Sequence, residues 1–237
     1  MSIASLRREL KTYIDPERAK ASAWFFKTGP GEYGEGDEFI GVAVPNLRKV
    51  AKAHRDLSLA EIETLLKSKV HEERLLAVLI LVMQYKQTDD YHKEEIYNFY
   101  LNHTEYVNNW DIVDSSAGYI VGNFLEERDK DVLIALARSS SIWERRIAII
   151  STFYFIQKGN PEWSLKLAEL LLDDEHDLIH KAVGWMLREV GKRCDQKILE
   201  DFLAENERYK TMSRTMLRYA IERLPEKRRQ AYLKGTI

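Results

Sequence analysis

Hydrophobic side chains recur at helical spacing along almost the whole chain after residue 45. Five long apolar stretches show this spacing, and they start near His71, Asn108, Ser141, His176 and Lys210. Shorter, more polar helical stretches lie between them, and short polar turns separate the stretches. No alternating pattern of the kind that marks a β-strand competes with the helical one. The pattern therefore predicts an all-α fold.

The spacing of the long stretches is nearly constant. Their starts are separated by 37, 33, 35 and 34 residues. A period in the mid-thirties with two helices per unit is typical of a stacked helical solenoid, in which each helix pair buries its faces against its neighbours. We expect one domain over residues 1–237, a curved solenoid of HEAT-like antiparallel helix pairs.

One segment departs from the helical pattern. Between Lys27 and Val44 the sequence KTGPGEYGEGDEFIGVAV places glycines among aromatic and apolar residues. Such punctuation is typical of a β-hairpin or an ordered loop between helices. It predicts a small hairpin-like insertion near residues 28–42.

Composition limits the class of protein. With 237 residues and 45% hydrophobic content, the chain can bury a continuous core. No apolar run approaches the roughly 18 residues that a membrane span needs. The N-terminal sequence MSIASLRREL has charges where a secretory signal would be apolar, and the single Cys194 cannot form an internal disulfide. These features predict a cytoplasmic protein.

Charge is distributed unevenly along the chain. The formal net charge is -2, which argues against a generally basic nucleic-acid binder. Residues 208–234, however, hold nine basic side chains against Glu222 and Glu226. Such a segment can contact DNA phosphates or can simply form a solvated helix face, and the charge count leaves both interpretations open.

Three cations fall at matching positions of successive repeats. Arg146, Lys181 and Arg214 are separated by 35 and 33 residues. Stacking of the repeats would align them on one side of the array, where a row of cations suits a polyanion backbone. The alternative is that each one caps or pairs with a neighbouring helix.

Trp110 and Asp114 are the first candidate site residues. They are four residues apart on one expected helix, so both side chains emerge on the same face. An indole beside a carboxylate can pack against a sugar or base while the anion stabilises positive charge or orients water. The alternative is a core tryptophan and a helix-turn aspartate. Asp111 lies on the adjoining face, and we expect it to pair with a neighbouring cation.

Trp185 and Arg146 are further candidates. Trp185 follows Gly184, which could let the indole lie close to a neighbouring backbone or a ligand. A buried arginine needs a partner, and a phosphate or Asp114 could supply one for Arg146.

These residues stand in recognisable stretches. The segments NNWDIVDSSAGYIVGNF, SIWERRIAI and HKAVGWMLREVGK resemble the signature stretches of the HEAT-like DNA alkylation repair family. This family comprises AlkD-like alkylpurine DNA glycosylases and hairpin-containing relatives that bind branched DNA. The resemblance in length, repeat order and motif spacing covers nearly the whole chain.

The resemblance implies a function and a site. The chain would be a monofunctional glycosylase, acting as a monomer without cofactor or metal, that removes cationic alkylpurines (N3-methyladenine, N7-methylguanine) from DNA without full base flipping. Trp110 and Trp185 would cradle the deoxyribose, Asp114 would stabilise its cationic character and position water, and Arg146 would hold a phosphate. The complete set of expected DNA-binding residues is Arg146, Lys181, Arg188, Arg214 and Arg218. A protein of this kind would associate with the nucleoid when bound to DNA.

Two other functions stay open. The expected hairpin, together with the basic C-terminal segment, favours a non-catalytic binder of branched or distorted DNA. A protein-binding scaffold is the third interpretation, because helical solenoids often bind peptides.

Overall fold

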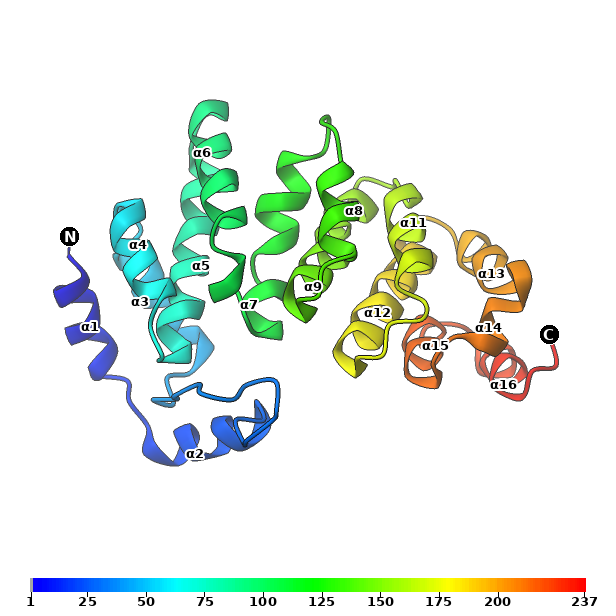
Figure 1. The fold of residues 1–237 in the computed structure, drawn as a ribbon, viewed down its shortest axis with the longest axis horizontal. Coiled ribbons are helices and arrows are strands. Elements are labelled where there is room, and N and C mark those ends of the chain that lie inside the picture. The colour runs from blue at the N-terminus through cyan, green and yellow to red at the C-terminus, as the bar shows by residue number, and fades with distance from the viewer. Residues whose placement is uncertain (1) are drawn as a thin grey trace. The chain divides into compact units, whose positions relative to one another are not determined.

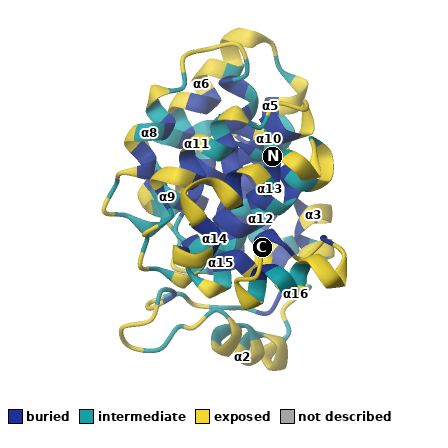
Figure 2. Ribbon diagram, turned by 90° about the vertical axis from the view of Figure 1, so that its right-hand side faces the viewer, coloured by how far each residue is buried: buried dark blue, intermediate teal, exposed yellow. Residues whose placement is uncertain are grey.

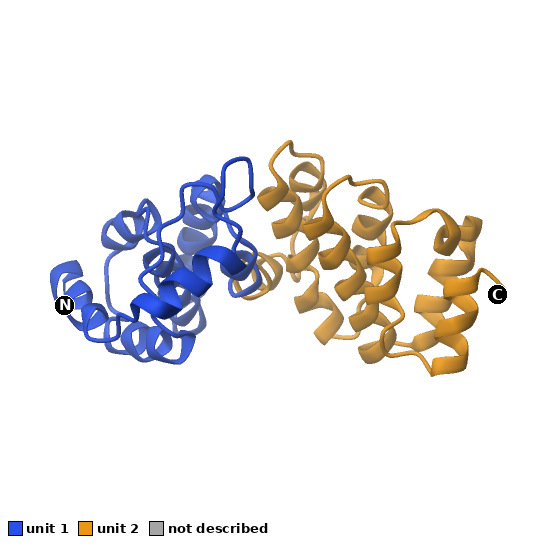
Figure 3. Ribbon diagram, turned by 90° about the horizontal axis from the view of Figure 1, so that it is seen from below, with its two compact units in different colours: residues 1–116 blue, residues 117–237 orange. Residues whose placement is uncertain are grey.

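The regular secondary structure of the protein is helical. The computed structural model describes residues 2–237, and within that range it contains helices and no strand. The chain divides into two compact units, Met1–Ser116 and Ala117–Ile237 (Figure 3). The predicted all-α class is confirmed for the described residues, whereas a single domain over the whole chain stays a prediction.

Unit 1 is built around its longest helix, α5 (His71–Gln87). Every residue of α5 from His71 to Val82 is buried. A helix buried on all sides must be apolar all round, which explains the run LLAVLILV in its middle. The other helices of this unit are α1 (Ile3–Lys11), α2 (Pro16–Phe25), α3 (Val44–Ala53), α4 (Leu59–Leu66), α6 (Asp90–Leu101), the 3-10 helix η1 (Thr104–Tyr106) and α7 (Trp110–Asp114). Helix α5 packs against α3 and α4 and also contacts α6 and α7 (Figure 1).

Unit 2 is built around α12 (Asp177–Arg193). The remaining helices of this unit are the π-helix η2 (Gly118–Gly122), α8 (Asp131–Ala137), α9 (Ile142–Ser151), α10 (Phe153–Gln157), α11 (Glu162–Leu170), α13 (Gln196–Ala204), the 3-10 helix η3 (Glu205–Glu207), α14 (Arg208–Thr211), α15 (Arg214–Ala220) and α16 (Glu226–Lys234). Helix α12 packs against α9, α13 and α15 (Figure 1). Gly184 permits the closest of these approaches, because an added Cβ there would lie 2.5 Å from the carbonyl oxygen of Met216 on α15.

Short polar side chains set where many of the helices begin. Ser2 and Ser58 form capping boxes at the starts of α1 and α4. Asp89 and Asp195 accept a backbone amide in the first turns of α6 and α13. Each cap satisfies a donor that the helix itself leaves unpaired, so these turns between apolar stretches stop one helix and start the next.

The apolar stretch that starts near Asn108 is interrupted. The chain forms the short α7, turns at Ser115 and Ser116, and continues as the π-helix η2. At Gly122 an added Cβ would collide with the carbonyl oxygen of Ser151, so η2 lies directly against the end of α9. A π-helical turn widens the helix locally, and such turns are frequent at functional sites.

The prediction of a hairpin-like insertion near residues 28–42 is wrong. The segment forms turns, and its β-type pairing within the described residues is one isolated bridge between Glu38 and Val70. The Glu38 amide donates to Lys69, and the His71 amide donates to Glu38. The segment thus pairs with the chain that leads into α5 instead of with itself, and Gly31 and Gly36 turn it with positive φ.

Candidate functional site

Helix α7 carries the first two predicted site residues, Trp110 and Asp114. The Asn109 side chain accepts from the Trp110 amide at 2.8 Å and so starts the helix, while Ile112 and Val113 are buried and anchor it. Trp110 and Asp114 are each partly exposed. Their spacing of one helical turn places them on the same face of α7. The indole and the carboxylate therefore share a face that solvent reaches.

The indole of Trp110 belongs to a cluster of stacked rings. It lies parallel to the ring of Phe26, with ring centres 5.2 Å apart and 11° between the planes, and it meets Phe25 edge-on at 6.0 Å. Phe26 also stacks on Phe39 at 5.0 Å, and Phe39 stacks on His71 at 4.6 Å. Offset stacking and edge contacts of this kind stabilise ring positions beyond simple area burial. Rings from α2, from the segment after it and from α5 thus fix the orientation of Trp110.

A buried ion network lies beneath this cluster. His71 contacts two carboxylates, Asp111 through Nε2 at 2.9 Å and Asp37 through Nδ1 at 3.2 Å. Arg74 donates to the other oxygen of Asp37 at 2.5 Å, and the Asn109 amide group donates to Asp37 at 3.2 Å. The expectation that Asp111 pairs with a neighbouring cation is confirmed, and the cation is His71.

His71 stays cationic and Asp37 stays anionic at neutral pH. Burial would lower the pKa of His71, but its hydrogen bonds to Asp111 and Asp37 outweigh this effect and raise the pKa to about 9. Burial would raise the pKa of Asp37, but the hydrogen bond from His71 and the charge of Arg74 outweigh it and lower that pKa. A cationic His71 therefore bridges Asp37 and Asp111, and Asp111 lies on the helix that carries Trp110 and Asp114.

Sequence reasoning missed His71 and the three charged residues that follow it. Glu72 accepts from the amides of Ile40 and Gly41 at 2.7 to 3.2 Å, and Glu73 pairs with Arg7 at 2.7 Å. The missed signal was the sequence HEER at the start of the most apolar stretch. Four consecutive helical residues point in all directions around the axis, so on a buried helix some of these charges must face inward and find partners.

Asp114 lies near a buried tyrosine. Tyr100 is fully buried, and its hydroxyl forms a hydrogen bond of 2.9 Å with Ser116. Burial raises the pKa of Tyr100, and the negative charge of Asp114 raises it further. The Tyr100 hydroxyl therefore stays protonated at neutral pH, and the charge of Asp114 contributes to this.

The other predicted site residues lie in unit 2. Trp185 on α12 is partly exposed, and its ring centre lies 5.9 Å from that of Phe153. Arg146 on α9 is only 5% exposed, and its guanidinium donates to the backbone carbonyl of Leu178 at 2.6 Å. Unit 2 therefore contributes a partly exposed aromatic pair, Trp185 and Phe153, and a buried cation, Arg146.

The remaining predicted cations contact their own or neighbouring helices. Lys181 pairs with Asp177 at 2.6 Å, and Arg188 pairs with Glu222 at 2.5 Å. Arg214 donates to the carbonyl of Leu233 at 2.8 Å. Arg146 and Arg214 thus contact neighbouring helices, as the alternative interpretation of the cation row expects, whereas the Asp177 partner of Lys181 lies on the same helix α12. Arg218 is exposed on α15. Their contacts to DNA stay predictions.

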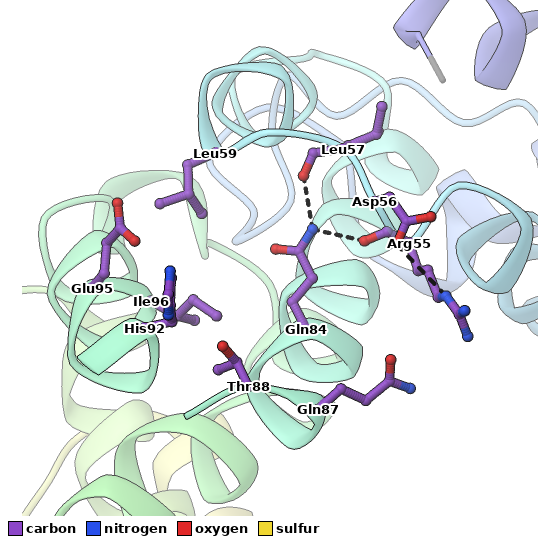
Figure 4. A pocket seen from close by; sticks show the side chains of 10 residues that line it. All are labelled: Arg55, Asp56, Leu57, Leu59, Gln84, Gln87, Thr88, His92, Glu95 and Ile96. Atoms are coloured by element: carbon purple, nitrogen blue, oxygen red, sulfur yellow. Dashed lines mark hydrogen bonds and ion pairs between the residues drawn. The ribbon is translucent and has the colours of Figure 1, made fainter. Parts of the chain in front are cut away.

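A pocket of about 470 Å³ lies elsewhere in unit 1, between the end of α3, α5 and α6 (Figure 4). Gln84 reaches across it and donates from its side-chain amide to the carbonyls of Arg55 and Leu57, each at 2.7 Å. None of the predicted site residues lines this pocket. Its central polar group is already bound to the backbone, so the pocket offers no clear chemistry.

Residues 2–237 contain neither a candidate metal cluster nor a membrane-spanning helix. These residues contain no group of three or more His, Cys, Asp or Glu side chains placed to hold a metal ion. No helix in the same range is long and apolar enough to cross a membrane.

The fold and these residues place the chain in a known family. The chain matches the DNA alkylation repair enzyme family over residues 6–224 and belongs to it. A solved structure described as a predicted DNA alkylation repair enzyme from Enterococcus faecalis is similar, with a TM-score of 0.68, 18% identity, and coverage of 90% of this chain and 97% of the other. The crystal structure of AlkD2 from Streptococcus mutans is also similar, with a TM-score of 0.51, 20% identity, and coverage of 93% and 97%. No curated protein matches the chain.

This family match confirms the resemblance to the DNA alkylation repair family that the sequence predicts. The likeness to AlkD2 is a likeness of fold, and it supports a HEAT-like arrangement of the helix pairs. Membership of a DNA repair family also implies that DNA is the ligand.

Proposed function

We propose that the protein hydrolyses the N-glycosidic bond of cationic alkylpurines, such as N3-methyladenine and N7-methylguanine, in duplex DNA and without full base flipping. The observation that carries this proposal is the pairing of Trp110 and Asp114 on one partly exposed face of α7. Membership of the DNA alkylation repair enzyme family supports it.

The chemistry of the substrate explains why so simple a site suffices. Alkylation at N3 or N7 places a positive charge on the purine. When the bond between C1′ and the purine nitrogen breaks, the electron pair goes to the base, which leaves neutral. The positive charge then lies on the deoxyribose, and water adds at C1′ and loses a proton. The reaction therefore needs a group that stabilises a cationic sugar more than it needs an acid for the leaving base.

Trp110 and Asp114 have the properties that this step needs. The face of an aromatic ring attracts a cation, and Phe26 supports the indole from behind. A carboxylate stabilises the developing charge and can orient the attacking water. In unit 2, we propose that Trp185 contacts the deoxyribose and that Arg146, Lys181, Arg188, Arg214 and Arg218 contribute to DNA binding.

The test is base release from a duplex that contains one N7-methylguanine. We expect the wild-type protein to release the base well above the spontaneous rate, and an Asp114→Asn variant to lose roughly a hundredfold in rate, since general-base and charge-stabilising groups contribute at least that much. Asp90→Asn, which neutralises an exposed carboxylate on α6, is the matched control and should release base at the wild-type rate. Release at the no-enzyme rate by both wild type and Asp114→Asn would rule out catalysis.

A second candidate is binding of branched or distorted DNA without catalysis. Its support from a hairpin is gone, and what favours it is the basic C-terminal segment, residues 208–234, with nine basic side chains against Glu222 and Glu226. This candidate predicts tighter binding of a four-way junction than of a linear duplex at matched salt, with no base release. Equal affinity for the two DNAs would exclude it.

A further inference from the structure

Two large aromatic side chains lie exposed at the end of α2. Trp24 is 84% exposed and Phe25 is 57% exposed, although both are residue types that folded proteins tend to bury. Helix α2 has no buried residue at all, and most of it is drawn as exposed in Figure 2. Adjacent exposed aromatic rings of this size mark an interaction surface, because a single exposed apolar residue is ordinary and a contiguous pair is not.

This aromatic pair is continuous with the candidate site. Phe25 contacts Trp110 edge-on at 6.0 Å, and the next residue, Phe26, stacks against the same indole. The exposed rings of Trp24 and Phe25 are therefore adjacent to the face of α7 that carries Trp110 and Asp114. A ligand that reaches Trp110 lies within reach of Phe25.

The backbone that carries the pair is ordered by hydrogen bonds. Lys27, two residues after the end of α2, has a positive φ, and its carbonyl accepts from the amide of Gly34 at 3.0 Å. The Thr28 amide donates back to Ala23 at 3.3 Å. Hydrogen bonds thus order the turn that directly follows the two rings. An ordered site loses less conformational entropy when a ligand binds.

The charge around the pair indicates which part of a nucleic acid it contacts. Glu32 and Glu35 lie in the turn that follows, where they accept from the amides of Gly29 and Gly31. On α2 itself, Lys20 pairs with Glu17 at 2.9 Å. Residues 15–38 as a whole hold six carboxylates against three cations, Arg18, Lys20 and Lys27. A net negative segment disfavours a phosphate backbone, whereas the uncharged face of a nucleobase is a suitable partner for exposed rings.

We propose that Trp24 and Phe25 form a base-stacking surface that holds an unstacked nucleobase of bound DNA next to the nucleotide at Trp110. In an intact duplex both faces of every base are covered by neighbours, so only a base at a helix defect offers a face to an indole. Base excision creates such a defect, because the removed purine leaves its neighbours and its opposite base partly unstacked. The surface therefore binds the damaged or excised form of the duplex. The proposal rests on the proposed function only in taking DNA as the ligand.

The experiment compares two duplexes of one sequence, an intact one and one with a tetrahydrofuran abasic analogue opposite 2-aminopurine. We expect Trp24→Ala to weaken binding of the abasic duplex by roughly tenfold, the loss typical of one base–aromatic stack, and to change binding of the intact duplex by less than about twofold. Trp24→Phe keeps a ring and should restore most of the affinity. Wild type should quench 2-aminopurine fluorescence on binding, and Trp24→Ala should not.

Tyr91→Ala is the matched control. Tyr91 is 77% exposed on α6 of the same unit, so the substitution removes an exposed ring elsewhere. It should leave both affinities unchanged. Urea unfolding of each variant should match wild type, because neither Trp24 nor Tyr91 is buried.

Three results would overturn the proposal. The first is an equal loss, or no loss, on both duplexes for Trp24→Ala. The second is an equal effect of Tyr91→Ala. The third is concentration-dependent self-association of the wild type that Trp24→Ala abolishes without changing DNA affinity, which would assign the rings to a second copy of the chain. A protein that releases no alkylpurine but shows the expected binding differences would fail the proposed function and leave this inference standing.

Discussion

The first turn of α5 places four consecutive charged residues inside unit 1, from His71 to Arg74. Their partners come from several segments. His71 and Arg74 share Asp37 after α2, and His71 also contacts Asp111 on α7. Glu72 accepts from amides before α3, and Glu73 pairs with Arg7 on α1. Buried charges are tolerated when they are paired and hydrogen-bonded, and breaking one pair leaves an uncompensated charge. His71 joins this network to α7 through Asp111 and to the ring cluster that holds Trp110 through Phe39.

His71 gives this network a pH dependence. Its folded pKa is about 9, above the ordinary value of 6.5, so the folded state binds the proton more tightly than the unfolded state. The resulting stabilisation is complete below pH 6.5, declines as the pH rises, and is lost above about 9. It is on the order of 3 kcal/mol at most. Urea unfolding between pH 6 and 10 measures it.

A His71→Gln variant isolates this contribution from those of other groups. The wild type should exceed the variant in free energy of unfolding at pH 6, and the difference should shrink steadily toward pH 9.5. A difference that stays constant across this range would show that His71 is not the titrating group.

Among the elements, η2 shows how glycine placement sets helix contacts. An added Cβ on Gly122 would collide with the Ser151 carbonyl and lie 2.9 Å from the Cβ of Tyr154, whereas one on Gly118 would meet its nearest atom, the Ile150 carbonyl oxygen, at 3.5 Å. We expect Gly122→Ala to lower the free energy of unfolding by roughly 1 to 3 kcal/mol, since η2 must move away from α9. Gly118→Ala adds only ordinary contacts and should be neutral or stabilising by up to about 1 kcal/mol. Equal unfolding midpoints in urea for the two variants would contradict this account.

The periodicity of apolar residues predicted the long helices, because a helix must be apolar on the face that it buries. Helices α9, α12 and α15 begin at Ile142, Asp177 and Arg214, within a few residues of the expected starts. The segment after α2 was a different case. Its glycines and aromatic residues fit a hairpin, but its partners are Val70 and the first turn of α5, which lie far away in sequence. Local pattern carries no information about such a partner.

For the molecule as a whole, the sequence located the candidate site only in part. The spacing of Trp110 and Asp114 predicts a shared face, and in the structure both residues lie on α7 and are partly exposed. Their role in a site stays a prediction. The support beneath that face could not be foreseen, because it joins Phe26, Phe39 and His71 from three separate segments.

The basic residues 208–234 illustrate the same limit. Counting charges suggests a DNA footprint, yet several of these cations are held by acidic side chains, namely Arg208 by Glu169 and Glu205, Arg228 by Glu200, and Arg229 by Glu226.

DNA affinity should therefore depend on exposed cations that are not already held by a carboxylate, more than on the total charge. Each phosphate neutralised by a cation contributes about 0.9 to the slope of log affinity against log salt concentration. Arg218 is exposed on α15, so Arg218→Gln should weaken binding uniformly across sequences and reduce this slope by about one. Arg228 is bonded to Glu200 at 2.6 Å, and Arg228→Gln, which removes the same charge, should leave the slope unchanged. Fluorescence anisotropy at a series of salt concentrations measures both slopes. If the two variants shift the slope equally, net charge and not the pairing of each exposed arginine controls binding, and the assignment of Arg218 to the DNA contact is wrong.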